Sequence, residues 1–246
     1  MIEFPPIEQA LDDPNGLLAS GGNLSPATLL NAYALGIFPW YDEDQPILWW
    51  SPDPRAVIIP SHVHISRSLK KSLRAQPFTL SINRCFNDVI GLCAEVHERR
   101  TGTWISDDMI TAYRELHALG YAHSIEVWLD KALVGGLYGV GFEKLFCGES
   151  MFHRVRDASK VAFVALCRLM HRLDVPIIDC QIENPHLTSL GAVNLSRSAF
   201  KHHLPQLGQS TGPNNADSLH NIYPRLSPSQ PLRLPWLNAV ELLAEP

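Results

Sequence analysis

A β-hairpin is predicted by the stretch Ser124-Ile-Glu-Val-Trp-Leu-Asp-Lys-Ala-Leu-Val-Gly-Gly-Leu-Tyr-Gly-Val140. Its first arm alternates apolar and polar residues, a two-residue turn follows, and an apolar arm returns. Working outward, residues 145–152 are typical of a further strand with a glycine kink, and residues 107–119 are typical of a helix. Residues 158–172 carry the apolar spacing of another helix, and residues 176–182 resemble a buried strand. This order predicts an α+β fold with a mostly antiparallel sheet and a helix laid across it.

An aromatic loop distinguishes the N-terminal part of the chain. The segment Gly36–Arg55 holds Trp40, Trp49 and Trp50, three of the six tryptophans, together with four prolines. Proline fixes its own φ and disfavours a helical conformation in the residue before it, so this segment cannot run as a helix. Clustered indole rings on a stiffened loop can stack a planar ligand or can close a small hydrophobic core.

The remaining elements complete the domain prediction. Helices are expected at residues 26–34, 66–75, 83–96 and 198–203, and short strands at residues 56–59 and 78–82. We expect a small N-terminal domain with the aromatic loop (residues 1–60), a larger α+β domain (61–206) and a Pro/Ser-rich tail (207–246). Within that tail, residues 237–243 are a candidate for a short docked helix.

Composition narrows the class of protein. Of 246 residues, 46% are hydrophobic and 18% are charged, which is ordinary for a globular protein with a real core. No apolar run is long enough to span a membrane, and the N-terminus does not have the pattern of a signal peptide. The five cysteines are scattered without a metal or redox spacing. We therefore expect a reduced, cytoplasmic protein with no membrane association and no structural metal.

The net charge of −5 does not by itself point to a nucleic-acid partner. One group of basic residues, Arg67, Lys70, Lys71 and Arg74, nevertheless falls on a single expected helix. Such a group is either a solvated helix face or a local patch that holds phosphates while the whole molecule stays acidic.

Three polar residues stand out within apolar strands. Asp179 and Gln181 end the run that begins at Val175, and side chains two apart on a strand share a face. A carboxylate there is costly unless it is paired or used, or it simply accepts backbone hydrogen bonds at a turn. Glu149 needs a cationic or amide partner, which is either internal, such as Arg154 or Arg156, or part of a ligand.

Several familiar motifs are absent from the sequence. His62 and His64 have no third metal ligand at a recognised spacing. The segment 148–152 is not a nucleophile elbow, and the glycines of residues 135–141 lie in a hairpin and not in a dinucleotide-binding turn.

Taken in order, ten short segments resemble the leucyl/phenylalanyl-tRNA–protein transferases, and together they cover residues 13–200. The segments are Asn15-Gly-Leu-Leu18, Gly21-Gly-Asn-Leu-Ser-Pro26, Gly36-Ile-Phe-Pro-Trp40, Trp49-Trp-Ser-Pro-Asp-Pro-Arg55, Gly102-Thr-Trp-Ile105, Gly135-Gly-Leu-Tyr-Gly-Val140, Gly148-Glu-Ser-Met-Phe152, Ala158-Ser-Lys160, Asp179-Cys-Gln181 and His186-Leu-Thr-Ser-Leu-Gly-Ala192. The resemblance implies an enzyme that moves Leu or Phe, and Met less well, from its tRNA to the N-terminal Arg or Lys of a protein, which creates a degradation signal. It also implies an acyl-CoA N-acyltransferase-like (GNAT-type) fold for the larger domain, no free cofactor and a monomer.

The resemblance also suggests roles for residues. Trp40 and Trp104 would sandwich the terminal adenosine of the tRNA, with Tyr33 and Tyr113 nearby. Glu149 would anchor the positive end of the acceptor. We hypothesise that Gln181 accepts a hydrogen bond from the acceptor amine while Asp179 orients that amine and favours its proton loss.

Two larger sets complete the expected site. The candidates for an apolar pocket that accepts Leu and Phe are Leu137, Phe146, Phe163, Leu166, Met170 and Ile178, which are otherwise plain core residues. The candidates for contacts with tRNA phosphates are Arg67, Lys70, Lys71 and Arg74.

Two residues depart from the family pattern, namely His153 and Asp157, and both lie near the expected acceptor site. Two other functions are compatible with parts of the sequence. An acetyl-CoA-dependent N-acetyltransferase would need a glycine-rich turn before the helix at residue 158, and residues 153–158 contain no glycine. A non-enzymatic RNA- or peptide-binding module would not require Asp179 and Gln181 beside a buried Glu149.

Overall fold

Two β-sheets form the frame of the protein. The computed structural model describes residues 2–101, 104–142, 144–204 and 237–238. A three-stranded antiparallel sheet has the order β1-β3-β2, and an eight-stranded sheet has the order β10-β4-β9-β8-β7-β6-β5-β11. The strands are β1 (Leu17–Ser20), β2 (Phe38–Pro39), β3 (Leu48–Trp50), β4 (Arg55–Ile58), β5 (Thr79–Ile82), β6 (Ala122–Leu129), β7 (Ala132–Phe142), β8 (Leu145–His153), β9 (Ile177–Gln181), β10 (Val193–Leu195) and β11 (Leu237–Asn238). Among these described strands, β8 and β9 are the single parallel pair. The predicted α+β fold with a mostly antiparallel sheet is therefore confirmed.

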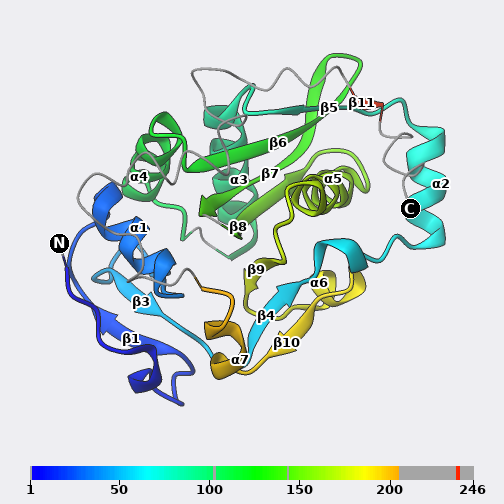
Figure 1. Cartoon of the computed structure of the whole chain (residues 1–246). Helices are drawn as coiled ribbons and strands as arrows, with labels where there is room; N and C mark the ends of the chain where they lie inside the picture. Colours follow the sequence, from blue (N-terminus) through cyan, green and yellow to red (C-terminus); the bar gives the residue numbers. More distant parts are fainter. Residues whose placement is uncertain (1, 102–103, 143, 205–236, 239–246) are drawn as a thin grey trace.

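Helices cover both faces of the larger sheet (Figure 1). They are η1 (Ile7–Gln9), α1 (Pro26–Ala34), η2 (Pro60–His62), α2 (Arg67–Ala75), α3 (Phe86–Thr101), α4 (Asp107–Ala118), α5 (Ala158–Arg172), α6 (Pro185–Ser189) and α7 (Arg197–Lys201). Ser25, Ser66 and Ser106 begin α1, α2 and α4, because each hydroxyl accepts a hydrogen bond from a backbone N–H in the first turn.

The core consists of two hydrophobic clusters, one on each face of the larger sheet. The first cluster joins α5 and α2 to one face, and the second joins α1, α3 and α4 to the other. Successive side chains of a strand alternate between these clusters, so Leu137 of β7 belongs to the first and Tyr138 belongs to the second. A site that reaches both faces can therefore take residues from both clusters.

Most expected elements occur close to their predicted positions, but several details differ. α3 begins at Phe86 and not at Asn83, because Asn83 has a left-handed φ of 55°. β4 pairs with β9 and β10 inside the larger sheet, although the sequence assigned it to the N-terminal unit. Leu237–Asn238 pairs with β5 as a short strand, so the expected helix is wrong at these two residues. The rest of the tail from residue 207 lies outside the described residues.

Within the described residues, no helix has both the length and the apolar character that crossing a bilayer requires.

Candidate functional site

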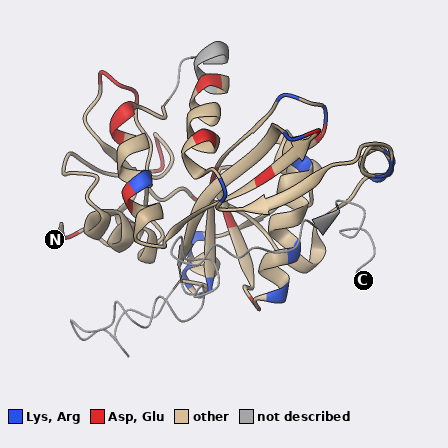
Figure 2. Ribbon diagram, turned by 90° about the horizontal axis from the view of Figure 1, so that it is seen from above, with Lys and Arg blue, Asp and Glu red and all other residues tan. Residues whose placement is uncertain are grey.

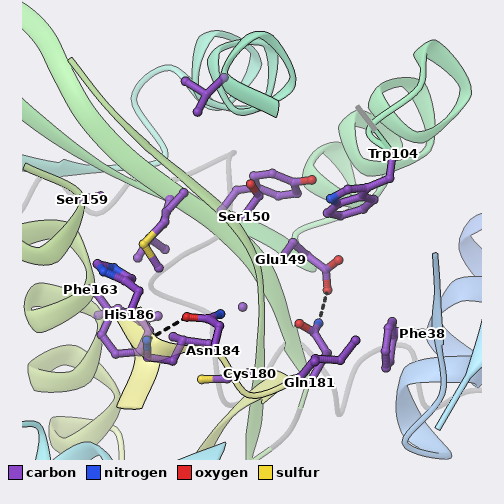
Figure 3. A pocket seen from close by; sticks show the side chains of 18 of the residues that line it. Phe38, Trp104, Glu149, Ser150, Ser159, Phe163, Cys180, Gln181, Asn184 and His186 are labelled. Atoms are coloured by element: carbon purple, nitrogen blue, oxygen red, sulfur yellow. Dashed lines mark hydrogen bonds between the residues drawn. The ribbon is translucent and has the colours of Figure 1, made fainter. Parts of the chain in front are cut away.

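A cavity of about 550 Å³ lies where the parallel strands β8 and β9 end their pairing. Residues of the second hydrophobic cluster and the aromatic loop form one half, here called the aromatic half: Phe38, Trp40, Val96, Trp104 and Tyr138. Residues of the first cluster form the other half, here called the apolar half: Leu137, Met151, Phe163, Leu166 and Leu187. Figure 3 shows Glu149 and Gln181 between Trp104 and Phe38 on one side and Phe163 on the other. The cavity thus joins two apolar surfaces through a polar centre.

Two β-bulges turn Glu149 and Gln181 toward each other. On β8, Ser150 pairs with Tyr138 and Gly148 pairs with Gly139, so Glu149 is an extra residue in the ladder. On β9, the pairing with β4 shifts by one residue before Gln181, whose φ of 59° is left-handed. A bulge bends its strand and redirects the neighbouring side chains. As a result, Gln181 Nε2 donates a hydrogen bond of 3.1 Å to Glu149 Oε1 (Figure 3).

The carboxylate of Glu149 is surrounded by hydrogen-bond donors. The Tyr33 hydroxyl of α1 donates to Oε1 at 2.8 Å, and the Tyr113 hydroxyl of α4 donates to Oε2 at 2.9 Å. The two hydroxyls also contact each other. Burial raises the pKa of Glu149 to about 7, although the hydrogen bonds from Tyr33, Tyr113 and Gln181 oppose that rise. The internal partners are therefore two tyrosines and an amide, in place of the arginines that the sequence suggested.

Three donors leave one of the approximately four acceptor positions of this carboxylate for a ligand. Tyr33 and Tyr113 are buried behind Glu149 and are not part of the cavity wall. The two tyrosines therefore orient the carboxylate of Glu149 from behind and do not line the cavity themselves.

Asp179 lies behind the cavity in a buried ion pair. Its two carboxylate oxygens accept from Arg55 Nε at 2.8 Å and from Arg55 Nη2 at 2.7 Å, and both side chains are 1% exposed. The Arg55 guanidinium lies between the rings of Phe38 and Phe200, at 4.8 Å and 4.7 Å from their centroids. Asp179 Oδ1 also accepts the backbone N–H of Gln181 at 2.9 Å. Asp179 and Arg55 therefore fix the backbone of Gln181.

The expectation that Asp179 and Gln181 point the same way does not hold. It assumed a regular two-residue alternation, whereas the register shift and the left-handed Gln181 interrupt that alternation. Sequence reasoning also missed Arg55 as the partner of Asp179. The signal was an arginine at the start of an otherwise apolar strand, because a buried arginine needs a carboxylate partner.

The tryptophans of the aromatic loop occupy two different environments. Trp49 is 1% exposed, packs edge-on against Phe4 at 4.9 Å and donates to Gly21 O, so it closes the core. Trp40 is 42% exposed and lines the cavity, and the centroid of its ring is 5.7 Å from that of Trp50. Together with Trp104, Trp40 gives the cavity indole surface that a ligand can reach.

The apolar half contains part of the expected pocket. Leu137, Phe163 and Leu166 line the cavity, whereas Phe146, Met170 and Ile178 are buried in the core and do not reach it. Met151 and Leu187 line the cavity and were not expected. Both belong to segments that carry the family resemblance, and that was the available signal.

Polar residues close the far end of the apolar half. His153, Ser159, Asn184 and His186 lie there, and Ser159 Oγ is 3.4 Å from His153 Nδ1. Burial lowers the pKa of His186, and the charges of Lys160 and His153 lower it further. Of this set only His153 was singled out in the sequence, while Ser159 and His186 lie in segments that carry the family resemblance. In the described part of the chain, no group of three or more His, Cys, Asp and Glu side chains could hold a metal ion.

The basic residues of α2 form an exposed face of their own. Arg67, Lys70, Lys71 and Arg74 are exposed, while Leu69 and Leu73 pack into the first cluster. In Figure 2, α2 lies at the right edge of the molecule and carries Lys and Arg without Asp or Glu. The structure thus gathers these four residues on one helix outside the cavity wall.

Comparisons with known proteins place the sequence in one family. Residues 57–205 match the family model described as "Leucyl/phenylalanyl-tRNA protein transferase", and residues 22–53 match the model of its N-terminal domain. The chain is 59% identical to a leucyl/phenylalanyl-tRNA–protein transferase of Aromatoleum aromaticum over 80% of this chain and 84% of that protein. It is 56% identical to one of Shewanella baltica over 80% of this chain and 83% of that protein. It is 52% identical to one of Tolumonas auensis over 86% of this chain and 91% of that protein.

These matches define the class of the chain as an aminoacyltransferase. More particularly, it belongs to the leucyl/phenylalanyl-tRNA–protein transferase family. Among solved structures, it is similar to the L-PGS protein of Bacillus licheniformis, with a TM-score of 0.40 and 11% identity over 82% of this chain and 70% of that one.

Proposed function

We propose that this protein transfers leucine or phenylalanine, and methionine less well, from aminoacyl-tRNA to proteins whose N-terminal residue is Arg or Lys. The observation that carries the proposal is the order of surfaces along the cavity: an aromatic half, a polar centre and an apolar half. The end of an aminoacyl-tRNA has the same order, namely an adenine ring, an ester and an amino-acid side chain. We further propose a monomer that acts in the cytoplasm.

The aromatic half suits the adenine base. Trp40 and Trp104 offer indole faces, and base stacking on aromatic side chains contributes about 1–3 kcal/mol per base. The four basic residues of α2, Arg67, Lys70, Lys71 and Arg74, are proposed to contact phosphates elsewhere on the tRNA. The transfer reaction is proposed to need no bound cofactor, because the aminoacyl ester is already activated.

The apolar half suits the side chain of Leu or Phe. Leu137, Phe163 and Leu166 form its walls together with Met151, whose flexible thioether adapts to either shape. An apolar pocket distinguishes a single methylene by only about 1–3 kcal/mol, which is why methionine is expected to be accepted less well.

Gln181 is proposed to act at the reacting centre. Its Nε2 donates to Glu149, so its Oε1 is free to accept a hydrogen bond from the α-amine of the acceptor. The neutral amine nitrogen attacks the ester carbonyl carbon, the bond from that carbon to the ribose oxygen breaks, and the ribose oxygen leaves with a proton. The amine loses one proton as the peptide bond forms. Asp179 is a positioning residue here, because it acts through the backbone N–H of Gln181.

Glu149 is proposed to bind the positive charge of the acceptor. Glu149 lines the cavity, and a charge-assisted hydrogen bond to an ammonium or guanidinium group is stronger than a neutral one. The GNAT-type fold for residues 61–206 is part of the same proposal, and the parallel pair β8–β9 beside the cavity supports it.

Transfer of label tests this function directly. The pure protein is incubated with radiolabelled Phe-tRNA and with peptides that differ only in an N-terminal Arg, Lys or Ala. We expect label on the Arg and Lys peptides and none on the Ala peptide. Intact Phe-tRNA with no labelled peptide would contradict transfer, and equal labelling of all three peptides would contradict the proposed acceptor specificity.

A further inference from the structure

Strand β8 has one edge beside the cavity to which the mechanism above gives no role. β8 pairs with β7 from Leu145 to His153, apart from the bulged Glu149, but its parallel ladder with β9 ends at Cys147. Among the described strands, no other one continues the ladder on that side of β8. Alternate residues of a strand direct their backbone N–H and C=O groups away from an antiparallel neighbour. Residues 149–153, here called the open edge of β8, therefore present backbone donors and acceptors where β9 has diverged.

The open edge of β8 is accessible to a ligand. The three residues of β8 that pair with β9 are buried, whereas Met151 is half-buried and His153 is exposed. Glu149, Met151 and His153 line the cavity, and so do Ile182 and Asn184, which follow the end of β9. Ile182 is a large apolar residue and is nevertheless 47% exposed. The cavity therefore extends along the open edge, between the two diverging strands.

The other walls of the cavity already have a proposed occupant. The aromatic half takes the adenosine, and the apolar half takes the side chain of Leu or Phe. The acceptor must begin at the polar centre, because its α-amine has to reach Gln181 and its positive charge has to reach Glu149. The following residues of the acceptor therefore need a path out of the centre. The open edge starts at Glu149 and leads to the polar residues around His153, so it provides that path.

A peptide on the open edge would not compete with the side chain of Leu or Phe. Side chains of a strand stand roughly perpendicular to the sheet, whereas the backbone hydrogen-bonding groups point sideways within the sheet. At Met151, the side chain therefore belongs to the apolar half, and the backbone belongs to the open edge. Both ligands can lie against β8 at the same time.

We propose that residues two to four of the acceptor bind as an extended strand along the open edge, parallel to β8, in the place that β9 leaves. This inference rests on the proposed function and deepens it, because it states how the acceptor is held beyond its first residue. At about 3.3 Å per strand residue, the path from Glu149 to His153 is about 13 Å long, which is room for about four extended residues. Strand addition uses backbone groups that every peptide has, so one site can hold acceptors that differ after the first residue.

Ester substitutions in the acceptor test the inference in the transfer assay. In a peptide of Arg followed by six Ala residues, one peptide bond at a time is replaced by an ester, which removes one N–H and changes the shape little. Consecutive N–H groups of a strand point to opposite sides, so only one of residues three and four donates to β8. We expect the ester at that residue to raise KM about five- to tenfold, as for one hydrogen bond, with kcat unchanged.

The remaining esters are the controls. Esters at the other residue of that pair and at residues six and seven, which extend past His153, should leave KM unchanged. Equal KM values for all the peptides, or equal increases at every position, would overturn the inference.

Hydrogen exchange of the enzyme provides the second measurement. The protein is first saturated with 3′-phenylalanylamido-adenosine, whose amide cannot transfer its amino acid. At about ten times its Kd, the unmodified Arg peptide should then slow exchange of the accessible backbone N–H groups in residues 149–153 about tenfold. The control is β10 (Val193–Leu195), a strand at one end of the same sheet, where exchange should not change. If label transfer proceeds while the open edge stays unprotected, the inference is wrong and the enzyme stands. If the Arg peptide receives no label at all, the proposed function fails and the inference with it.

Discussion

Asp179 and Arg55 show how one buried pair holds the reacting centre. Removing one charge leaves the other buried without compensation, which costs about 3–5 kcal/mol. We therefore predict that Asp179→Asn lowers the free energy of unfolding by about that amount, as measured by urea denaturation. The double variant Arg55→Met with Asp179→Leu should recover much of the stability but not the transfer rate, because the backbone N–H of Gln181 still lacks the carboxylate that accepts its hydrogen bond. A loss below about 1 kcal/mol in Asp179→Asn would contradict this role.

Glu149 should give the stability of the protein a characteristic pH dependence. Its pKa is about 7 in the folded protein, against 4.5 as the ordinary value. The folded state therefore binds the proton more tightly, so the stabilisation is complete below pH 4.5 and is lost as the pH rises to about 7. Relative to Glu149→Gln, the unfolding free energy of the wild type should fall by about 3 kcal/mol across this window and then level off. A constant difference between the two proteins from pH 4 to 8 would refute the shift.

Some residues of the site could be identified from the sequence and others could not. Trp40 was identified from the aromatic loop, and Glu149 and Gln181 were identified as polar residues within apolar strands. The structure brings all three to the cavity. Arg55 was not identified as the partner of Asp179. An arginine at the start of an otherwise apolar strand indicates that a carboxylate partner is needed, but only the folded sheet, in which β4 pairs with β9, shows that this partner is Asp179.

At the scale of elements, β7 and β8 approach so closely that one glycine is required. A Cβ on Gly139 would lie 2.2 Å from Cys147 O and 2.5 Å from the Phe146 ring. We predict that Gly139→Ala destabilises the protein by about 3 kcal/mol or more, because the backbone of β8 must shift. The matched control is Gly91→Ala in α3, where a Cβ meets nothing within 4 Å. It should stabilise the protein by about 0.5–1 kcal/mol. Equal effects of the two variants on Tm would contradict this packing.

The basic helix α2 should contribute to tRNA affinity through salt-dependent contacts. We predict that Lys70→Gln and Lys71→Gln each weaken Phe-tRNA binding and reduce the slope of log affinity against log salt by about 1. Lys131→Gln is the control, because Lys131 is equally exposed but lies in the turn between β6 and β7. Filter binding at several salt concentrations measures all three variants. If Lys131→Gln changed the slope as much as the α2 variants, the proposed phosphate contacts would be wrong.

Elements differ in how far the sequence predicts them. The bounds of α5 were predicted in full, because its apolar residues repeat with a helical period over fifteen positions. A glycine kink was predicted within residues 145–152, next to the bulge at Glu149, but the bulge before Gln181 was not predicted, because a single inserted residue leaves no periodic trace. These bulges are the features that aim the side chains of the site.

At the scale of the whole molecule, two features of the larger sheet form the cavity. The sheet separates two hydrophobic clusters, and the pairing of β8 with β9 ends at Cys147 and Asp179, so that the strands diverge there. One cluster supplies the aromatic half and the other the apolar half, so a single ligand can contact both faces of the sheet. The polar centre lies at the edge where the parallel pairing ends. This arrangement explains how segments from residue 38 to residue 187 contribute to one site.

The single-turnover rate of Gln181→Gly tests the central claim most directly. Glycine suits the left-handed φ at this position, so the variant removes the amide without straining the backbone. With Phe-tRNA bound in advance and the Arg peptide at saturation, we predict a rate roughly a hundredfold below that of the wild type. The affinity for Phe-tRNA should change by no more than about threefold, because base and side chain bind elsewhere in the cavity. A rate within about threefold of the wild type, with tRNA binding intact, would contradict the assignment of this centre.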